Sequence, residues 1–155
     1  MHLTFLRNQK MCVLNIMIKK NIIDKAPKPV GNYPHSVECD GVLYISGIGP
    51  RSGVDNSIPG NKYDSDNNLI EYNIEKQVHS VFSNVKLILE ESNSSWNNLL
   101  DVTVFLIDMK SDFDKFNEIY NQYFIDAHSC RTTVEVNALP TDIAIELKCI
   151  ARINK

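Results

Sequence analysis

Apolar side chains recur with a helical period in two segments of the chain. Residues 72–91 carry one apolar stripe, which predicts an amphipathic helix that covers a core. This stripe comprises Ile74, Val78, Val81, Phe82, Val85, Ile88 and Leu89. A second helix is predicted from residue 112 to about residue 126, with a stripe of Phe113, Phe116, Tyr120, Tyr123 and Phe124. Ser111 is its expected N-cap, with Asp114 in the capping-box position.

Other segments have the alternation of β-strands. Residues 37–45 predict two short strands around the turn Asp40-Gly41. Residues 99–107 predict a strand whose apolar side consists of Leu100, Val102, Val104 and Leu106. Two more strands are expected at residues 131–137 and 143–153. The order β-β-α-β-α-β-β predicts an α+β domain in which both helices cover one face of the sheet. The other face keeps apolar residues, which favours oligomerisation.

The N-terminal segment differs in character from the rest of the chain. It contains Arg7, Lys10, Lys19 and Lys20, and no acidic residue precedes Asp24. The apolar run at residues 11–18 is too short to span a bilayer. We expect residues 1–24 to be a disordered extension, with organelle targeting as the alternative, and residues 25–155 to form a single domain. A polar loop from about residue 51 to residue 69 is long enough to suggest a functional role.

Composition narrows the class of partner. The formal net charge is -3 and no basic cluster stands out in the folded part, which disfavours nucleic acid as the main ligand. The four cysteines lack metal-ligand spacing, and no histidine pair has helical ligand spacing, so no metal site is predicted. Cysteines without a clear secretory signal favour reduced thiols and a cytoplasmic protein.

Two charged residues in the C-terminal strands are the main candidates for chemistry. Arg131 opens one strand, and its guanidinium could hold a carboxylate through two hydrogen bonds. Glu146 lies between branched aliphatic residues in a strand with a mostly buried pattern, and it could move a proton. A structural ion pair between the two is the alternative. Asn117 falls on the aromatic face of the second helix, where it either bonds to nearby backbone or lines a pocket.

Several motifs, in this order along residues 26 to 153, resemble the Rid (YjgF-type) family. They are Gly31–Ser36, Ser46-Gly47, Asp108-Met109, Asn117–Tyr120, Cys130–Val134, Leu139-Pro140 and Ile145-Glu146. The resemblance implies a chorismate-mutase-like fold with a mixed sheet, and a homotrimer with active sites between subunits. It also implies hydrolysis of small enamines and imines to ketones and ammonia without a cofactor.

Within that family the chain is most similar to the 2-aminomuconate deaminase branch. The similarity rests on Tyr33-Pro34-His35, on the long loop after Ser46-Gly47, and on Arg51 followed by Asp55-Asn56. The commoner family pattern has Ser-Gln after the tyrosine. The substrate implied by this branch is a dicarboxylate, for which a second cation is expected.

The resemblance also assigns roles to residues. Arg131 corresponds to the arginine that binds the substrate carboxylate, and Glu146 to the glutamate that orients water or exchanges a proton. The expected pocket residues are Tyr33, Asn117, Ser46, Gly47 and Thr133. A raised pKa is expected for Glu146 because its surroundings are apolar.

Two further residues have open roles. His35 is an acid, a base or a ligand of the far carboxylate, or else a packing residue. Arg51 is the second cation, or else a solvated loop residue.

Two other functions compete with deamination. A non-catalytic trimeric module that binds a metabolite or a protein would keep Arg131 and would not depend on Glu146. An endoribonuclease or translation inhibitor is the other, since family members often carry that label. The acidic charge balance counts against this last function.

Overall fold

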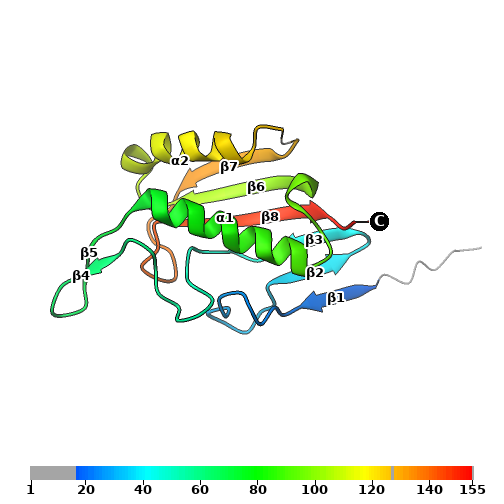
Figure 1. Cartoon of the computed structure of the whole chain (residues 1–155), viewed down its shortest axis with the longest axis horizontal. Coiled ribbons are helices and arrows are strands. Elements are labelled where there is room, and N and C mark those ends of the chain that lie inside the picture. The colour runs from blue at the N-terminus through cyan, green and yellow to red at the C-terminus, as the bar shows by residue number, and fades with distance from the viewer. Residues whose placement is uncertain (1–16, 127, 155) are drawn as a thin grey trace, which may run out of the picture.

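The structure is a computed structural model that describes residues 17–126 and 128–154. A six-stranded sheet has the order β1-β2-β3-β8-β6-β7, and both helices lie on one of its faces (Figure 1). The strands are β1 (Ile18–Asn21), β2 (Ser36–Cys39), β3 (Val42–Ile45), β6 (Leu99–Leu106), β7 (Cys130–Glu135) and β8 (Ile145–Arg152). The helices are α1 (Ile74–Glu91) and α2 (Met109–Tyr123), and a short 3₁₀ turn, η1, spans Trp96–Asn98. The predicted α+β fold with two helices on one face is confirmed.

The sheet is mixed because α2 connects two neighbouring strands. β7 runs parallel to β6, whereas every other pair in this sheet is antiparallel. A parallel pair needs a crossover, and α2 supplies it. β7 is an edge strand, and β3 and β8 are the two middle strands of the sheet.

The core lies between the centre of the sheet and the helices. Along β8, Ile145, Leu147, Cys149 and Ala151 are buried, and the residues between them face the other side of the sheet. α1 contributes the predicted stripe, of which all members except Ile74 are fully buried. The turn Asp40-Gly41 has positive φ at both residues, as a two-residue hairpin of type I′ requires, and it joins β2 to β3 as predicted.

The prediction that Leu100 faces the core is wrong. Leu100 is 41% exposed, whereas Leu99 is buried. The pairing of β6 with β8 shifts register between Leu99 and Asp101, so this bulge turns Leu99 inward and Leu100 outward. Alternation is regular beyond the bulge, and the other three residues of the predicted face are buried.

The predicted start of the second helix is also wrong. α2 begins at Met109, and its N-cap is Asp108, whose carboxylate accepts a hydrogen bond of 2.9 Å from the Ser111 N–H. Glu135 accepts a second helix-terminal bond, of 2.7 Å, from the Met109 N–H. Aspartate and serine are both good N-caps. The aspartate caps the helix because β6 ends at Leu106 and the chain turns directly after it.

The expectation of disorder does not hold for residues 18–24. β1 pairs with β2, and the buried Asn21 donates a 3.1 Å hydrogen bond to the Ser36 hydroxyl. This part of the segment is therefore the edge of the sheet, while residues 1–16 lie outside the described part. No helix among the described residues is long and apolar enough to cross a membrane.

The long polar loop contains a small hairpin of β4 (Lys62–Tyr63) and β5 (Leu69–Glu71), which projects beyond the end of the main sheet (Figure 1). A buried glutamine fixes its base. Gln77 donates to the Asn61 side chain at 2.8 Å and accepts from the Ala144 N–H at 2.7 Å. The loop is thereby anchored to α1 and to the start of β8.

Candidate active site

Arg131 lies at the edge of the sheet, beneath α2. Its strand partner is Val102, which is a core residue, so the Arg131 side chain points to the helix-covered face. Its Nη1 donates a 2.9 Å hydrogen bond to Asn117 Oδ1, and its guanidinium lies 4.5 Å from the centre of the Tyr120 ring. Arg131 nevertheless stays exposed. It is therefore oriented by α2 and has N–H groups left for a ligand.

Thr133 lies two residues along the same strand and on the same face. Its hydroxyl oxygen is buried and has no hydrogen-bond partner within the described residues. An unsatisfied buried polar group of this kind costs about 1–3 kcal/mol. The orphaned hydroxyl beside a partly free guanidinium is typical of a site that a polar ligand completes.

Glu146 lies on the opposite face of the sheet. Its strand partner is Phe105, which points away from the helices, and Glu146 is half-buried there. Burial raises the pKa of the Glu146 carboxyl above its usual range, in the expected direction. No hydrogen-bond donor or cation among the described residues pairs with its carboxylate.

Gly47 makes room for the Glu146 side chain. It follows β3, and a Cβ added to it would lie 2.8 Å from Glu146 Cδ and closer still to Oε1. Any other residue at position 47 would therefore displace the carboxylate. Glycine is required here for close approach of the backbone rather than for a turn.

The N-terminal part of the site is assembled around Gly47. Tyr33, His35, Ser46, Gly47 and Arg51 line one cavity, so the structure brings five predicted site residues together. Tyr33 is 42% exposed at its mouth. The Ser46 hydroxyl donates a 2.7 Å hydrogen bond to the Pro34 carbonyl, so its main role is to fix the turn that carries Tyr33.

His35 is a structural residue. It is buried, its Nδ1 accepts a 3.0 Å hydrogen bond from the Ile23 N–H, and its Nε2 donates to the Pro27 carbonyl at 3.1 Å. Both ring nitrogens are thus used by backbone groups. The proposed roles of His35 in acid-base chemistry or carboxylate binding do not fit this arrangement. The sequence could not show it, because the two partners come from the folding of the segment around the ring.

Arg51 is tied to its own surroundings. Its Nη2 donates to the Lys28 carbonyl at 2.7 Å, and its Nη1 donates to Asn56 Oδ1 at 3.2 Å. These bonds join the start of the long loop to the segment before Tyr33. Arg51 lines the cavity, and these two bonds to neutral acceptors use two of the five N–H groups of its guanidinium.

The two principal residues are far apart within one chain. Arg131 is level with Cys149 of β8, three residues from Glu146, which corresponds to about 10 Å along the strand. β6 separates β7 from β8, which adds about 10 Å across the sheet. The side chains also lie on opposite faces. The structural ion pair between Arg131 and Glu146 is therefore not formed within one chain, and the two side chains do not meet at one site of that chain.

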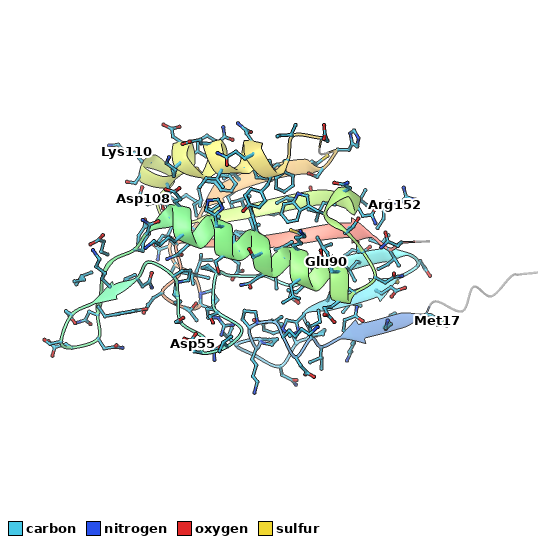
Figure 2. The ribbon with its side chains drawn as sticks, viewed as in Figure 1. Met17, Asp55, Glu90, Asp108, Lys110 and Arg152 are labelled. Carbon is cyan, nitrogen blue, oxygen red and sulfur yellow. The ribbon has the colours of Figure 1, made fainter. Side chains whose placement is uncertain are left out.

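Arg131 and Glu146 also lie toward different ends of the sheet. Asp108, at the start of α2, and Arg152, at the end of β8, lie at opposite ends (Figure 2). Glu146 is the second residue of β8 and lies near the Asp108 end of the sheet. Arg131 pairs with residues closer to the Arg152 end. The Arg131 region and the Glu146 region are both accessible, and within one chain they do not contact each other.

The fold and these residues define an α+β protein with an arginine site and a glutamate site on separate surfaces. A family model described as endoribonuclease L-PSP matches residues 23–153. The chain belongs to this family, the Rid (YjgF-type) family.

Relatives match nearly the whole described domain. A RutC family protein of Pyrococcus abyssi is 35% identical over 131 residues, which cover 83% of this chain and 91% of the relative. The mitochondrial protein MMF1 of Saccharomyces cerevisiae is 36% identical over 126 residues, covering 81% of this chain and 78% of that protein. The crystal structure of Escherichia coli TdcF with bound serine superposes with a TM-score of 0.75 at 27% identity, covering 88% and 99% of the two chains.

Lys148 was not among the site residues predicted from the sequence. Lys148 lines an open groove together with Tyr33, Ser46 and Gly47, on the face of the sheet that bears Glu146. The available signal was its spacing of two residues from Glu146, which places both side chains on the same face of a strand.

Proposed function

We propose that this protein is a cofactor-free hydrolytic deaminase of small enamine and imine carboxylates, and that each active site is built from two copies of the chain. The observation that carries the proposal is the division of the site. One surface has a partly free arginine beside an orphaned hydroxyl, and the other has a half-buried carboxylate without an ion-pair partner among the described residues. Each surface supplies what the other lacks.

The chemistry requires little beyond these groups. An enamine tautomerises to an imine, and water then adds to the carbon of the C=N bond. Arg131 of one copy holds the substrate carboxylate and so fixes that carbon relative to the water. Glu146 of another copy accepts a proton from the water as the C–O bond forms and returns it to the nitrogen. This gives a carbinolamine. A second proton then moves from its hydroxyl group to the nitrogen as the C–N bond breaks, and a ketone and ammonia leave.

The raised pKa of Glu146 suits this exchange. Burial brings the proton affinity of the carboxyl closer to that of the groups with which it exchanges, so transfer in both directions is easier near neutral pH. Among the described residues, no cation forms an ion pair with this carboxylate. These features agree with a role in proton transfer.

The open face of the sheet supports assembly. It carries Tyr44, which is 47% exposed, and Val134, which is 37% exposed, with Phe105 and Ile150 partly exposed between them. An apolar face of this kind is typical of an interface between subunits. We propose that it is covered by further copies of the chain in a homotrimer, as the family resemblance implies.

The substrate is proposed to be an amino-acid-sized carboxylate, with the dicarboxylate 2-aminomuconate as the specific candidate. Support for the size comes from the relative TdcF, whose structure contains serine. A cavity and an open groove, both lined by Tyr33, Ser46 and Gly47, adjoin the backbone against which Glu146 packs, and a longer substrate would extend into them.

The test measures ammonia release from 2-aminoacrylate and from 2-aminomuconate, each generated in situ. Wild type, Arg131→Ala and Glu146→Gln are compared at equal concentrations of folded protein. Acceleration by wild type that both variants lose supports the proposal. Acceleration that survives in Glu146→Gln contradicts the mechanism. If wild type accelerates neither reaction, the deaminase proposal fails, and retained binding of a carboxylate would favour a non-catalytic module.

A further inference from the structure

We propose that Lys148 binds a second anionic group of the substrate and thereby selects dianionic over monoanionic enamines. This inference rests on the proposed function, whose site it extends. It names a residue that determines specificity and does not assign Lys148 a part in the chemical step.

The placement of Lys148 is the first argument. On β8 it follows Glu146 by two residues, so the two side chains share the open face of the sheet, about 7 Å apart along the strand. Lys148 is paired with Thr103 of β6 and lies in the groove formed with Tyr33, Ser46 and Gly47. Its ammonium thus belongs to the same depression as three predicted substrate-binding residues.

Its charge is not neutralised within the described part of the chain. Lys25, Lys62 and Lys115 each form an ion pair with a glutamate at 2.6–2.7 Å. Lys148 is exposed and pairs with no acidic group among the described residues. A free surface lysine is common and argues nothing alone, but this one lines a groove with Gly47, against which the Glu146 carboxyl packs, and it shares the sheet face of Glu146.

The order of charges along the site supplies the second argument. The substrate carboxylate next to the reacting carbon is held by Arg131 of another copy, and the reacting carbon is at Glu146. Lys148 lies about 7 Å from Glu146 along β8, a distance that an extended dicarboxylate with its reacting carbon at Glu146 can span. Arg51, the cation expected for this role, donates instead to Lys28 and Asn56.

The kinetic experiment compares a dicarboxylate with a monocarboxylate substrate. The ratio of kcat/KM for 2-aminomuconate to kcat/KM for 2-aminoacrylate is measured in wild type, Lys148→Met, Lys148→Arg and Lys76→Met. Lys76 is a matched control, because it is an exposed lysine on α1, across the sheet from the groove. We expect Lys148→Met to lower the ratio at least tenfold through KM, and we expect Lys148→Arg to retain most of it. The control should keep the wild-type ratio.

A binding experiment keeps the inference separate from the proposed function. Calorimetric titration with muconate and with sorbate compares a dicarboxylate and a monocarboxylate with the same carbon chain, neither of which can release ammonia. A preference for muconate that Lys148→Met loses supports the inference even if no deamination is found. An unchanged kcat/KM ratio in active Lys148→Met, or a muconate preference independent of Lys148, overturns it. Thermal unfolding of each variant confirms that the compared proteins are folded.

Discussion

The carboxyl group of Glu146 occupies the space in which a side chain of residue 47 would begin. A Cβ on Gly47 would come within 2.8 Å of Glu146 Cδ. The backbone at the end of β3 and the side chain at the start of β8 therefore determine each other's position. This contact links the sheet topology to the proposed chemistry, because β3 and β8 are neighbours only in the folded sheet.

Replacing Gly47 with alanine should reduce activity more than stability. Glu146 is flexible and can move away from the new methyl group, but a carboxylate displaced by about 1 Å is expected to lower kcat/KM on the order of 100-fold. Gly49→Ala is the matched control, since its Cβ would meet Ile143 Cδ1 at 2.8 Å instead of the carboxylate. Deamination kinetics and thermal unfolding are measured for both variants. Equal losses of activity would contradict a specific role of the Gly47–Glu146 contact.

The pH dependence of deamination should follow the ionisation of Glu146. The carboxylate must be ionised to accept a proton from water, and burial raises its pKa above 4.5. We expect kcat/KM to rise with pH through this raised pKa, which places the acidic limb above that of an ordinary glutamate. In Glu146→Gln the residual rate should show no such limb. A wild-type acidic limb at or below pH 4.5 would argue against Glu146 as the base.

The same raised pKa has a consequence for stability. The folded state binds the Glu146 proton more tightly than the unfolded state, so ionisation of Glu146 disfavours folding. This loss of stability is absent below the unfolded-state pKa and becomes complete as pH rises through the folded-state pKa. Glu146→Gln should therefore gain stability relative to wild type as pH rises from the unfolded-state pKa of glutamate through the raised folded-state pKa. Urea unfolding at a series of pH values measures the difference, and a constant difference would contradict the expectation.

Mixing two inactive variants should restore activity if the site is shared. Arg131→Ala keeps Glu146, and Glu146→Gln keeps Arg131, so an interface between the two types can hold one intact site. In a cyclic oligomer assembled at random from equal amounts, about a quarter of the interfaces have this arrangement. We expect co-expressed variants to reach about a quarter of wild-type activity. A mixture as inactive as either variant alone would refute a site made from two copies.

Tyr72 should matter for stability and not for catalysis. Its hydroxyl donates a 2.9 Å hydrogen bond to the buried Asp112 carboxylate and joins the segment before α1 to the first turn of α2. Burial raises the pKa of Asp112, and the bond from Tyr72 opposes that rise. Tyr72→Phe leaves the carboxylate without this donor and should destabilise the protein by about 1–3 kcal/mol. Denaturant unfolding measures the loss, while kcat/KM of the folded protein should stay near the wild-type value.

Much of the fold follows from local periodicity. The stripe in α1 and the alternation in β8 identify core residues without tertiary information, because helix and strand geometry fix which positions share a face. Periodicity did not show the bulge that exposes Leu100 or the choice of Asp108 as the N-cap. Both depend on where a neighbouring strand pairs or ends, which is a property of the assembled sheet.

The residue types of the site can be read from the sequence: an arginine, a glutamate and an asparagine in strands and helices of known period, and a glycine that the family resemblance assigns to the pocket wall. How these residues are grouped follows from the tertiary structure. It placed Arg131 under α2 and Glu146 on the open face, and it used both nitrogens of His35 for backbone contacts. It also brought Lys148 into the groove. The reason is physical: alternation fixes which residues share a face, whereas strand order and helix packing decide what each face meets.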